Sequence, residues 1–204
     1  MATPTPTRDL RILGVVFLWL FTGVVWSLAV PPLEAPDETA HVDLVRHVVD
    51  ERGYPRDPIE MDVATVSARA WVLGLAEDRR FTSEVPPRGD RPSFDDLTSD
   101  ATFDAPNQMI QHPPLGYLHL IAAEALGRAL PGDPAFDLQL WWLRLTTVLL
   151  GAAVPVLIAR GVRWLGGSPA QQVVAALLPL AIPQLTATLG TIGNDLPLVV
   201  AGAP

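Results

Sequence analysis

The feature that most constrains this chain is an unbroken apolar run near its start. Residues 12–30 are nineteen consecutive residues without an ionisable side chain. At about 1.5 Å per residue, a helix of that length crosses a hydrocarbon core of about 30 Å. Two further apolar stretches follow at residues 145–159 and 173–189, and a fourth begins at Leu196. We therefore expect an all-α polytopic membrane protein. Because the last run stops at residue 204, we expect the N-terminal fragment of a longer one.

Composition supports this expectation because charged and apolar residues are kept apart. The chain is 49% hydrophobic, with a mean hydropathy of +0.29, although it has 14 basic and 22 acidic residues. Residues 31–140 hold twenty acidic residues and nine arginines, a balance of −11. A surface of that charge repels phosphates, so a nucleic-acid partner is excluded. The absence of cysteine excludes disulfides and thiolate metal sites.

The positive charges around the first apolar run predict its direction. Arg8 and Arg11 precede the run, and no basic residue follows it until Arg46. The positive-inside rule therefore places the N-terminus, residues 1–11, in the cytoplasm. The alternative is a cleaved signal peptide, for which the small residues at 27–29 would provide the cleavage site.

A second pair of arginines predicts the direction of the next span. Arg160 and Arg163 close the second run, so the turn that follows them is expected in the cytoplasm. We expect a multi-pass protein of the cell (plasma) membrane, in contact with membrane lipids. Its predicted segments are a first span at 12–30, an extracytoplasmic loop at 31–140, a second span at 141–159, a cytoplasmic turn at 160–172, a third span at 173–189, and an outer turn with the start of a fourth span at 190–204.

The large loop is expected to carry two amphipathic helices that lie in the membrane interface. The first, at about residues 37–51, begins with acidic residues and continues with an apolar stripe. The second, at 113–130, has ionisable side chains within its apolar run, which suits an interfacial helix better than a span. Tyr117 is expected at headgroup level. Residues 84–107 are rich in Pro, Asp, Ser and Gly and predict an irregular loop.

Three polar clusters are predicted to converge at the outer ends of the spans. They are Asp37-Glu38 with His41, Gln111-His112, and Asn194-Asp195. A carboxylate that acts as a base, with histidines or arginines that bind a phosphate, would make an active site. In the competing structural interpretation, the two acidic residues only place negative charge at a helix start. A divalent metal held by Asp37, His41 and His112 stays open, but nothing in the sequence demands it, so we assign no metal ligand.

The motifs resemble, in order and topology, those of the GT-C superfamily of polyprenyl-phosphate-sugar glycosyltransferases. The closest likeness is to the aminoarabinose transferase and protein mannosyltransferase branch, and to a bacterial group with a Pro-Asp-Glu-x-x-His signature. The matching elements are Ala35-Pro36-Asp37-Glu38-Thr39-Ala40-His41 directly after the first span, His112-Pro113-Pro114-Leu115, Arg144-Leu145, and Asn194-Asp195.

The resemblance implies an enzyme of the bacterial cell envelope, inactive as a fragment because later spans are missing. It would transfer a sugar from a polyprenyl-phosphate donor to a lipid or glycan acceptor at the outer face, with inversion. The implied catalytic residues are Asp37, as the base, and Glu38; the implied substrate-binding residues are His41, His112, Tyr117, Asn194 and Asp195. The aminoarabinose transferases have a lysine before the Pro-Pro element, where this chain has His112. Arg69, Arg79 and Arg80 are alternative phosphate ligands.

Two other functional classes fit the same architecture. The first is a non-catalytic membrane protein, such as a transport or export scaffold, which would tolerate Asp37→Asn. The second is a transporter that uses Asp195 for protons or cations. A transporter is expected to have helices broken by Gly or Pro near the membrane midplane. We expect no such broken pair here, although Pro155, Pro179 and Pro183 weaken that objection.

Overall fold

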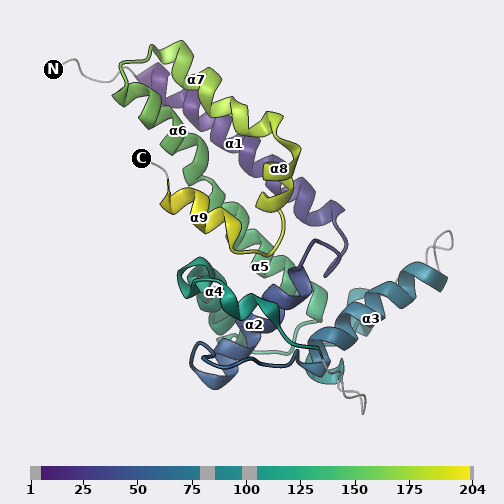
Figure 1. The fold of residues 1–204 in the computed structure, drawn as a ribbon. Coiled ribbons are helices and arrows are strands. Elements are labelled where there is room, and N and C mark those ends of the chain that lie inside the picture. The colour runs from purple at the N-terminus through teal and green to yellow at the C-terminus, as the bar shows by residue number, and fades with distance from the viewer. Residues whose placement is uncertain (1–5, 79–85, 98–104, 203–204) are drawn as a thin grey trace.

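The computed structural model describes residues 6–78, 86–97 and 105–202, and this part of the chain is helical (Figure 1). Its only pairing of extended backbone is an isolated antiparallel bridge between Glu60 and Pro106. Two helices are long and apolar enough to cross a membrane, Leu10–Ala29 with 20 residues and Phe136–Trp164 with 29. The expectation of a helical protein with membrane-compatible helices is confirmed to that extent.

A hydrogen bond joins the two candidate spans at the point where a proline interrupts the second one. They consist of α1 (Pro6–Ala29) and of α5 (Phe136–Gly151) followed by α6 (Ala153–Trp164). Pro155 has no N–H to donate to the carbonyl of Gly151, four residues earlier. The indole Nε1 of Trp19 donates to that carbonyl instead, at 2.8 Å. The hydrogen bond that the proline leaves open therefore fastens α1 to α5.

The third predicted span, residues 173–189, is a bent pair of helices. It consists of α7 (Pro169–Leu177), a 3-10 turn (Leu178–Ala181) and α8 (Pro183–Leu189). The two parts meet at 81°, as a broken span or a re-entrant loop would. Pro183 causes the break because it lacks an N–H and disfavours helical backbone at Ile182. Our expectation that the spans contain no broken helix pair is therefore wrong.

The candidate spans and the bent pair form one bundle. A buried cluster joins the first half of α1 to α6 and α7 through Val15, Ala159 and Ala176. Figure 1 shows that the start of α1 and the α6–α7 connection lie at the same end of this bundle. The arginines at the start of the first span and at the end of the second therefore share one end of the bundle. The direction in which these spans cross a membrane stays a prediction.

The outward faces of the bundle are apolar. On α1, Phe17 is 71% exposed and Phe21 57% exposed, and on α7 Val174 is 61% exposed. Such faces are too apolar for contact with water and suit contact with lipid.

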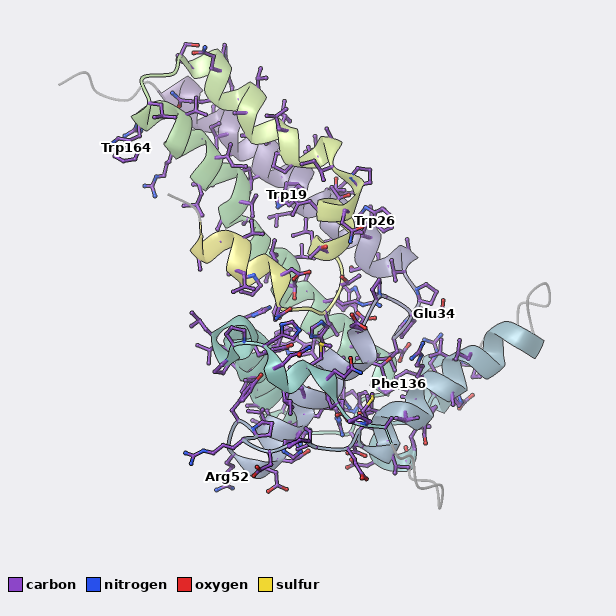
Figure 2. All side chains as sticks on the ribbon, in the orientation of Figure 1. Trp19, Trp26, Glu34, Arg52, Phe136 and Trp164 are labelled. Carbon is purple, nitrogen blue, oxygen red and sulfur yellow. The ribbon has the colours of Figure 1, made fainter. Side chains whose placement is uncertain are left out.

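The segment between the first two spans is a packed unit. This loop unit comprises the described residues among 31–135, with α2 (Glu38–Glu51), α3 (Val63–Asp78) and α4 (Leu118–Ala129). Its core includes Phe94, which contacts Phe136 edge-on at 5.8 Å between ring centroids, and Phe136 contacts Trp71 in the same way at 5.4 Å. Figure 2 shows Phe136, the first residue of α5, beside this unit and Trp19 in the bundle. The predicted irregular loop thus contributes a core side chain, although residues 98–104 lie outside the described ones.

Helix α4 has one buried and one exposed apolar face. Leu120, Ala123 and Glu124 face inward. Leu118 is 55% exposed and Leu126 54% exposed, and both extend a stripe of exposed apolar residues along the outer face. This helix and the preceding 3-10 turn (Pro114–Tyr117) cover the predicted interfacial segment. The two faces suit a helix that rests on a membrane surface.

Candidate functional site

A buried ion pair lies where the bundle meets the loop unit. Arg144 of α5 donates from Nε to Glu38 Oε1 at 2.7 Å and from Nη2 to Oε2 at 2.6 Å. The side chain of Glu38 is 0% exposed and that of Arg144 3% exposed. A bidentate ion pair of this kind is geometrically specific. Because both side chains are buried, removal of either one would leave the other as an uncompensated buried charge.

Arg144 also caps the C-terminal end of α1. Its guanidinium donates to the backbone carbonyls of Ser27 at 2.9 Å, Val30 at 2.6 Å and Pro31 at 2.9 Å. The last carbonyls of a helix have no partner within the helix, so a buried helix end needs donors from elsewhere. One side chain of α5 thus sets the position of the C-terminal end of α1.

Besides pairing with Arg144, Glu38 accepts hydrogen bonds from the backbone of two segments that connect helices. Its Oε2 accepts from the backbone N–H of Leu33 at 3.0 Å, and its Oε1 accepts from that of Ile192 at 3.1 Å. The first contact orders the α1–α2 connection and the second orders the α8–α9 connection. Because both oxygens are buried and already accept hydrogen bonds, the predicted catalytic role of Glu38 has no support in this geometry. Its contacts are those of a positioning residue.

The neighbouring carboxylate, Asp37, has the opposite environment. Asp37 is exposed, directly precedes α2 and makes no capping hydrogen bond with its side chain. Its backbone is left-handed, with φ 56°, and Leu33 in the same connection has φ 61°. Such a conformation costs a non-glycine residue about 1–3 kcal/mol and persists only where its surroundings impose it. The Glu38 contacts are the surroundings that hold Asp37 in this position.

His41 is the centre of the candidate site. Its Nδ1 lies 2.8 Å from the Tyr117 hydroxyl, and both residues are buried. Burial lowers the pKa of His41, and the nearby His112 lowers it further. Nearby negative charges act in the opposite direction, those of Asp37, Asp195 and Glu38. The predicted site residues from distant parts of the chain therefore lie close enough to influence one histidine.

Tyr117 and His112 reach the site from the 3-10 turns before α4. The ring centroids of His41 and His112 are 6.4 Å apart, and the Tyr54 hydroxyl donates to the His112 carbonyl at 2.8 Å. Burial raises the pKa of Tyr117, and Tyr54 and Asp195 raise it further, so its hydroxyl keeps its proton. Tyr117 is 0% exposed. Its side chain is therefore enclosed by protein, and its position at headgroup level stays a prediction.

The α8–α9 connection completes the site, and Gly116 allows it to approach closely. A Cβ on Gly193 would lie 3.8 Å from His41 Nε2, and one on Gly116 would lie only 3.0 Å from Asn194 Cβ. Asn194 is buried, whereas Asp195 is exposed at the start of α9 (Asp195–Ala201). The structure thus brings all three predicted clusters together.

The charge of the site is negative. Asp37 and Asp195 are exposed carboxylates, and the guanidinium of Arg144 is enclosed by its five hydrogen bonds. Of the alternative phosphate ligands, Arg69 is exposed on α3, while residues 79 and 80 lie outside the described residues. In the described part of the chain, no group of three or more His, Asp or Glu side chains could hold a metal ion.

The position of Arg144 in the sequence is itself a signal for a buried ion pair. It is the only charged residue between Asp137 and Arg160, within an otherwise apolar stretch. A lone charge in such a stretch needs a buried partner of opposite sign. That argument predicts a partner acid for Arg144, although it does not choose Glu38 over Asp37.

Comparisons of the chain with protein-family models, with curated proteins and with solved structures found no match.

Proposed function

We propose that this chain belongs to a multi-pass membrane glycosyltransferase of the GT-C type, which transfers a sugar from a polyprenyl-phosphate donor to a cell-envelope acceptor. The observation that supports this most strongly is the meeting of three segments at His41, whose ring centroid lies 6.4 Å from that of His112 and whose Nε2 would lie 3.8 Å from a Cβ on Gly193, next to Asn194-Asp195. These residues come from three segments far apart in the sequence, each of which resembles a motif of that family.

Asp37 is the base in this proposal. Its exposed carboxylate accepts the proton of the acceptor hydroxyl while that oxygen attacks C1 of the donor sugar. The bond between C1 and the phosphate oxygen breaks on the opposite side, so the configuration inverts and the polyprenyl phosphate leaves. Glu38 and Arg144 act as positioning residues because they hold the backbone on which Asp37 lies.

The donor phosphate needs a cationic partner. His112 is half-buried at the site and is the described residue best placed for this role. His41 is less suitable, because burial lowers its pKa.

The test compares sugar transfer by three forms of the protein at its full natural length, in membranes and at matched expression. Radiolabelled polyprenyl-phosphate sugars are the donors, and the forms are wild type, Asp37→Asn and Glu34→Gln. Glu34 is an exposed acid in the same connection, which makes it the matched control. We expect Asp37→Asn to reduce transfer by at least about a hundredfold and Glu34→Gln to leave it unchanged. Equal transfer by all three would exclude Asp37 as the base, and no transfer by wild type from any donor would contradict the enzyme proposal.

A transporter is the second candidate, favoured by the 81° bend between α7 and α8. Half-helices of this kind surround substrate and ion sites in many transporters. The connection after α8 leads directly to Asp195, the residue that would carry the proton or cation. Uptake driven by a proton gradient in proteoliposomes, lost in Asp195→Asn and kept in Asp37→Asn, would support this candidate over the transferase.

A further inference from the structure

The hydrogen bond between His41 and Tyr117 determines which nitrogen of the imidazole carries the proton. The Tyr117 side chain is fully buried, so water does not reach its hydroxyl. Among the described residues, the one hydrogen-bond partner of that hydroxyl is His41 Nδ1, at 2.8 Å. A buried hydroxyl proton needs an acceptor. Tyr117 therefore donates to Nδ1, which must be unprotonated in order to accept.

The same hydrogen bond sets the charge of His41. A neutral imidazole that accepts at Nδ1 carries its single proton on Nε2. A protonated imidazole has an N–H at both positions, and the Tyr117 hydroxyl would then lose its acceptor. Burial acts in the same direction, because it lowers the pKa of His41. His41 is therefore a neutral residue that can donate a hydrogen bond through Nε2.

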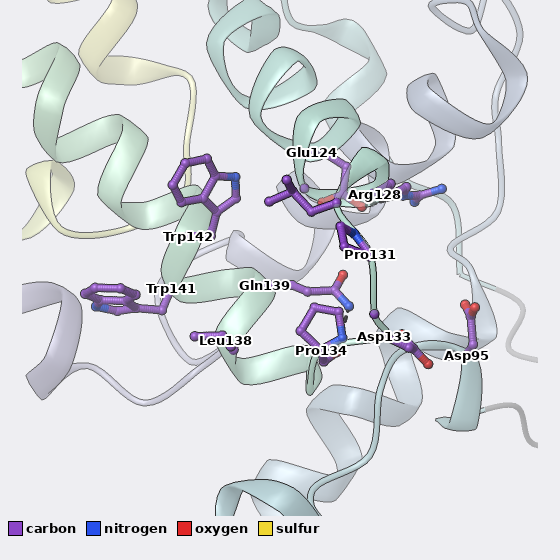
Figure 3. Close-up of a pocket in the computed structure, with 13 residues that line it drawn as sticks. Asp95, Glu124, Arg128, Pro131, Asp133, Pro134, Leu138, Gln139, Trp141 and Trp142 are labelled. Carbon is purple, nitrogen blue, oxygen red and sulfur yellow. Dashed lines mark hydrogen bonds and ion pairs between the residues drawn. The ribbon is translucent and has the colours of Figure 1, made fainter.

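The donor at Nε2 is unused and open. It has no hydrogen-bond partner among the described residues, and it is not one of their unpartnered atoms that are closed to solvent. Gly193 lies beside it, and even a Cβ at that position would remain 3.8 Å from Nε2. A cavity of about 810 Å³ lies between the end of α4 and the start of α5 (Figure 3), and His41 does not line it. A ligand that binds Nε2 therefore lies in the candidate site and not in that cavity.

Exposed carboxylates flank this donor. Asp37 precedes His41 by one helical turn, and its backbone carbonyl accepts from the His41 backbone N–H at 3.0 Å. Asp195 follows Gly193 by two residues. A neutral donor between two negatively charged acceptors suits a group that both accepts and donates hydrogen bonds, as a hydroxyl does. A phosphate oxygen without a proton only accepts, and the two carboxylates would repel its charge.

We propose that His41 binds a hydroxyl group of a sugar substrate through its Nε2–H, and that Tyr117 is the positioning residue that fixes this donor. The hydroxyl accepts from Nε2 and donates its own proton to a neighbouring carboxylate. The identification of the ligand as a sugar rests on the proposed function, whereas the protonation of His41 does not. A site that hydrogen-bonds a hydroxyl rejects an analogue without it, so His41 selects between sugars that differ at one carbon.

The first measurement is the nitrogen magnetic resonance spectrum of the protein at its full natural length, with isotope-labelled histidine, in lipid nanodiscs at neutral pH. The chemical shifts of the two ring nitrogens report which one carries the proton, and His41→Gln identifies the His41 signals. We expect a protonated Nε2 and an unprotonated Nδ1. A proton on Nδ1, or on both nitrogens, would overturn the inference. This outcome does not depend on sugar transfer, so it is separate from the test of the proposed function.

The variant Tyr117→Phe tests the positioning role, because it keeps the ring and removes the hydroxyl. Without the donated hydrogen bond the neutral form of His41 is less stable, so we expect the pKa of His41 to rise by about 0.5 to 1. Tyr54→Phe is the matched control: the ring centroids of Tyr54 and Tyr117 are 6.5 Å apart, but the Tyr54 hydroxyl donates to the His112 carbonyl. Equal pKa values for His41 in the two variants would exclude the positioning role. Both variants retain the other ionisable groups whose charges act on His41, which are Asp37, Glu38, His112 and Asp195.

The same signals test the ligand. Methyl glycosides of neutral hexoses and pentoses, and separately inorganic phosphate, are added at increasing concentration. We expect a methyl glycoside to shift the Nε2 signal saturably and phosphate to leave it in place. A shift with phosphate alone, or no shift with any compound, would overturn the assignment of a sugar hydroxyl. Sugar transfer by wild type together with no such shift would keep the proposed function and reject this role of His41.

Discussion

The bundle and the loop unit are stabilised by different interactions. In the bundle, glycines allow close packing: a Cβ on Gly190 would lie 2.8 Å from the Gly23 carbonyl oxygen, and one on Gly151 would overlap Leu189. In the loop unit, polar side chains join the elements. Asn107 donates to Asp43 at 2.7 Å, and Arg46 and Glu124 form a buried ion pair at 3.3 Å.

This difference matches the solvents that the two regions are proposed to meet. In lipid, burial of apolar surface provides little drive for association, so helices associate through close packing of small residues. In water, a packed core with satisfied polar groups is stable. Glu38 and Arg144 connect the two regions, and the candidate site lies beside that connection. In the proposed transferase, a carboxylate placed there meets a donor whose lipid part stays in the membrane.

The largest expected effect is the loss of the connection itself. Arg144→Met leaves the Glu38 carboxylate buried without its partner and opens the end of α1, so we expect a loss of about 3–5 kcal/mol of stability. Thermal unfolding in detergent measures it, with Arg160→Met, an exposed arginine of α6, as the control. The double variant with Glu38→Gln should recover part of the loss. If Arg144→Met proves as stable as Arg160→Met, the connection is not what holds the two regions together.

A smaller effect tests close packing in the bundle. Gly190→Ala places a methyl group 2.6 Å from Trp26 Cβ and against the backbone of α1, which cannot move away easily. We expect a loss of about 1–3 kcal/mol. Gly161→Ala is the same change where nothing lies within 4 Å, and there we expect a gain of up to about 1 kcal/mol. Equal unfolding temperatures for the two variants would contradict the comparison.

The smallest expected effect is a dependence of stability on pH within the loop unit. Burial lowers the pKa of His119 in α4 from 6.5 to about 4. The unfolded chain then binds the proton more tightly, so the folded state loses stability as the pH falls from about 6.5 towards 4. We expect a loss of about 1 kcal/mol, allowing for the partial exposure of the side chain.

The variant His119→Gln isolates this contribution. Asp43 acts in the opposite direction, because burial raises its pKa and the folded state gains stability as its carboxyl takes up a proton. The difference between wild type and His119→Gln removes the Asp43 contribution from the measurement. A difference that stays constant between pH 6.5 and 4 would show that His119 does not titrate as its burial requires.

The helices could be predicted because their signals are local. The apolar run at residues 12–30 and the acidic start of residues 37–51 predict α1 and α2 without knowledge of any contact. Clustering of Asp37, His112 and Asp195 followed from the predicted topology, which places their segments at the same ends of the spans. The bend between α7 and α8 was missed because proline shows where a helix can break but not whether packing will bend it.

The sequence by itself determined the type and position of most helices and the segments that meet at the site, since periodicity, charge and proline act over a few residues. Only the tertiary structure decided which of two adjacent carboxylates is exposed and can act as a base. Asp37 is exposed, and Glu38 is buried against Arg144, 106 residues later. The physical reason is that burial and pairing of a charge depend on partners distant in the chain, and local patterns do not specify those partners.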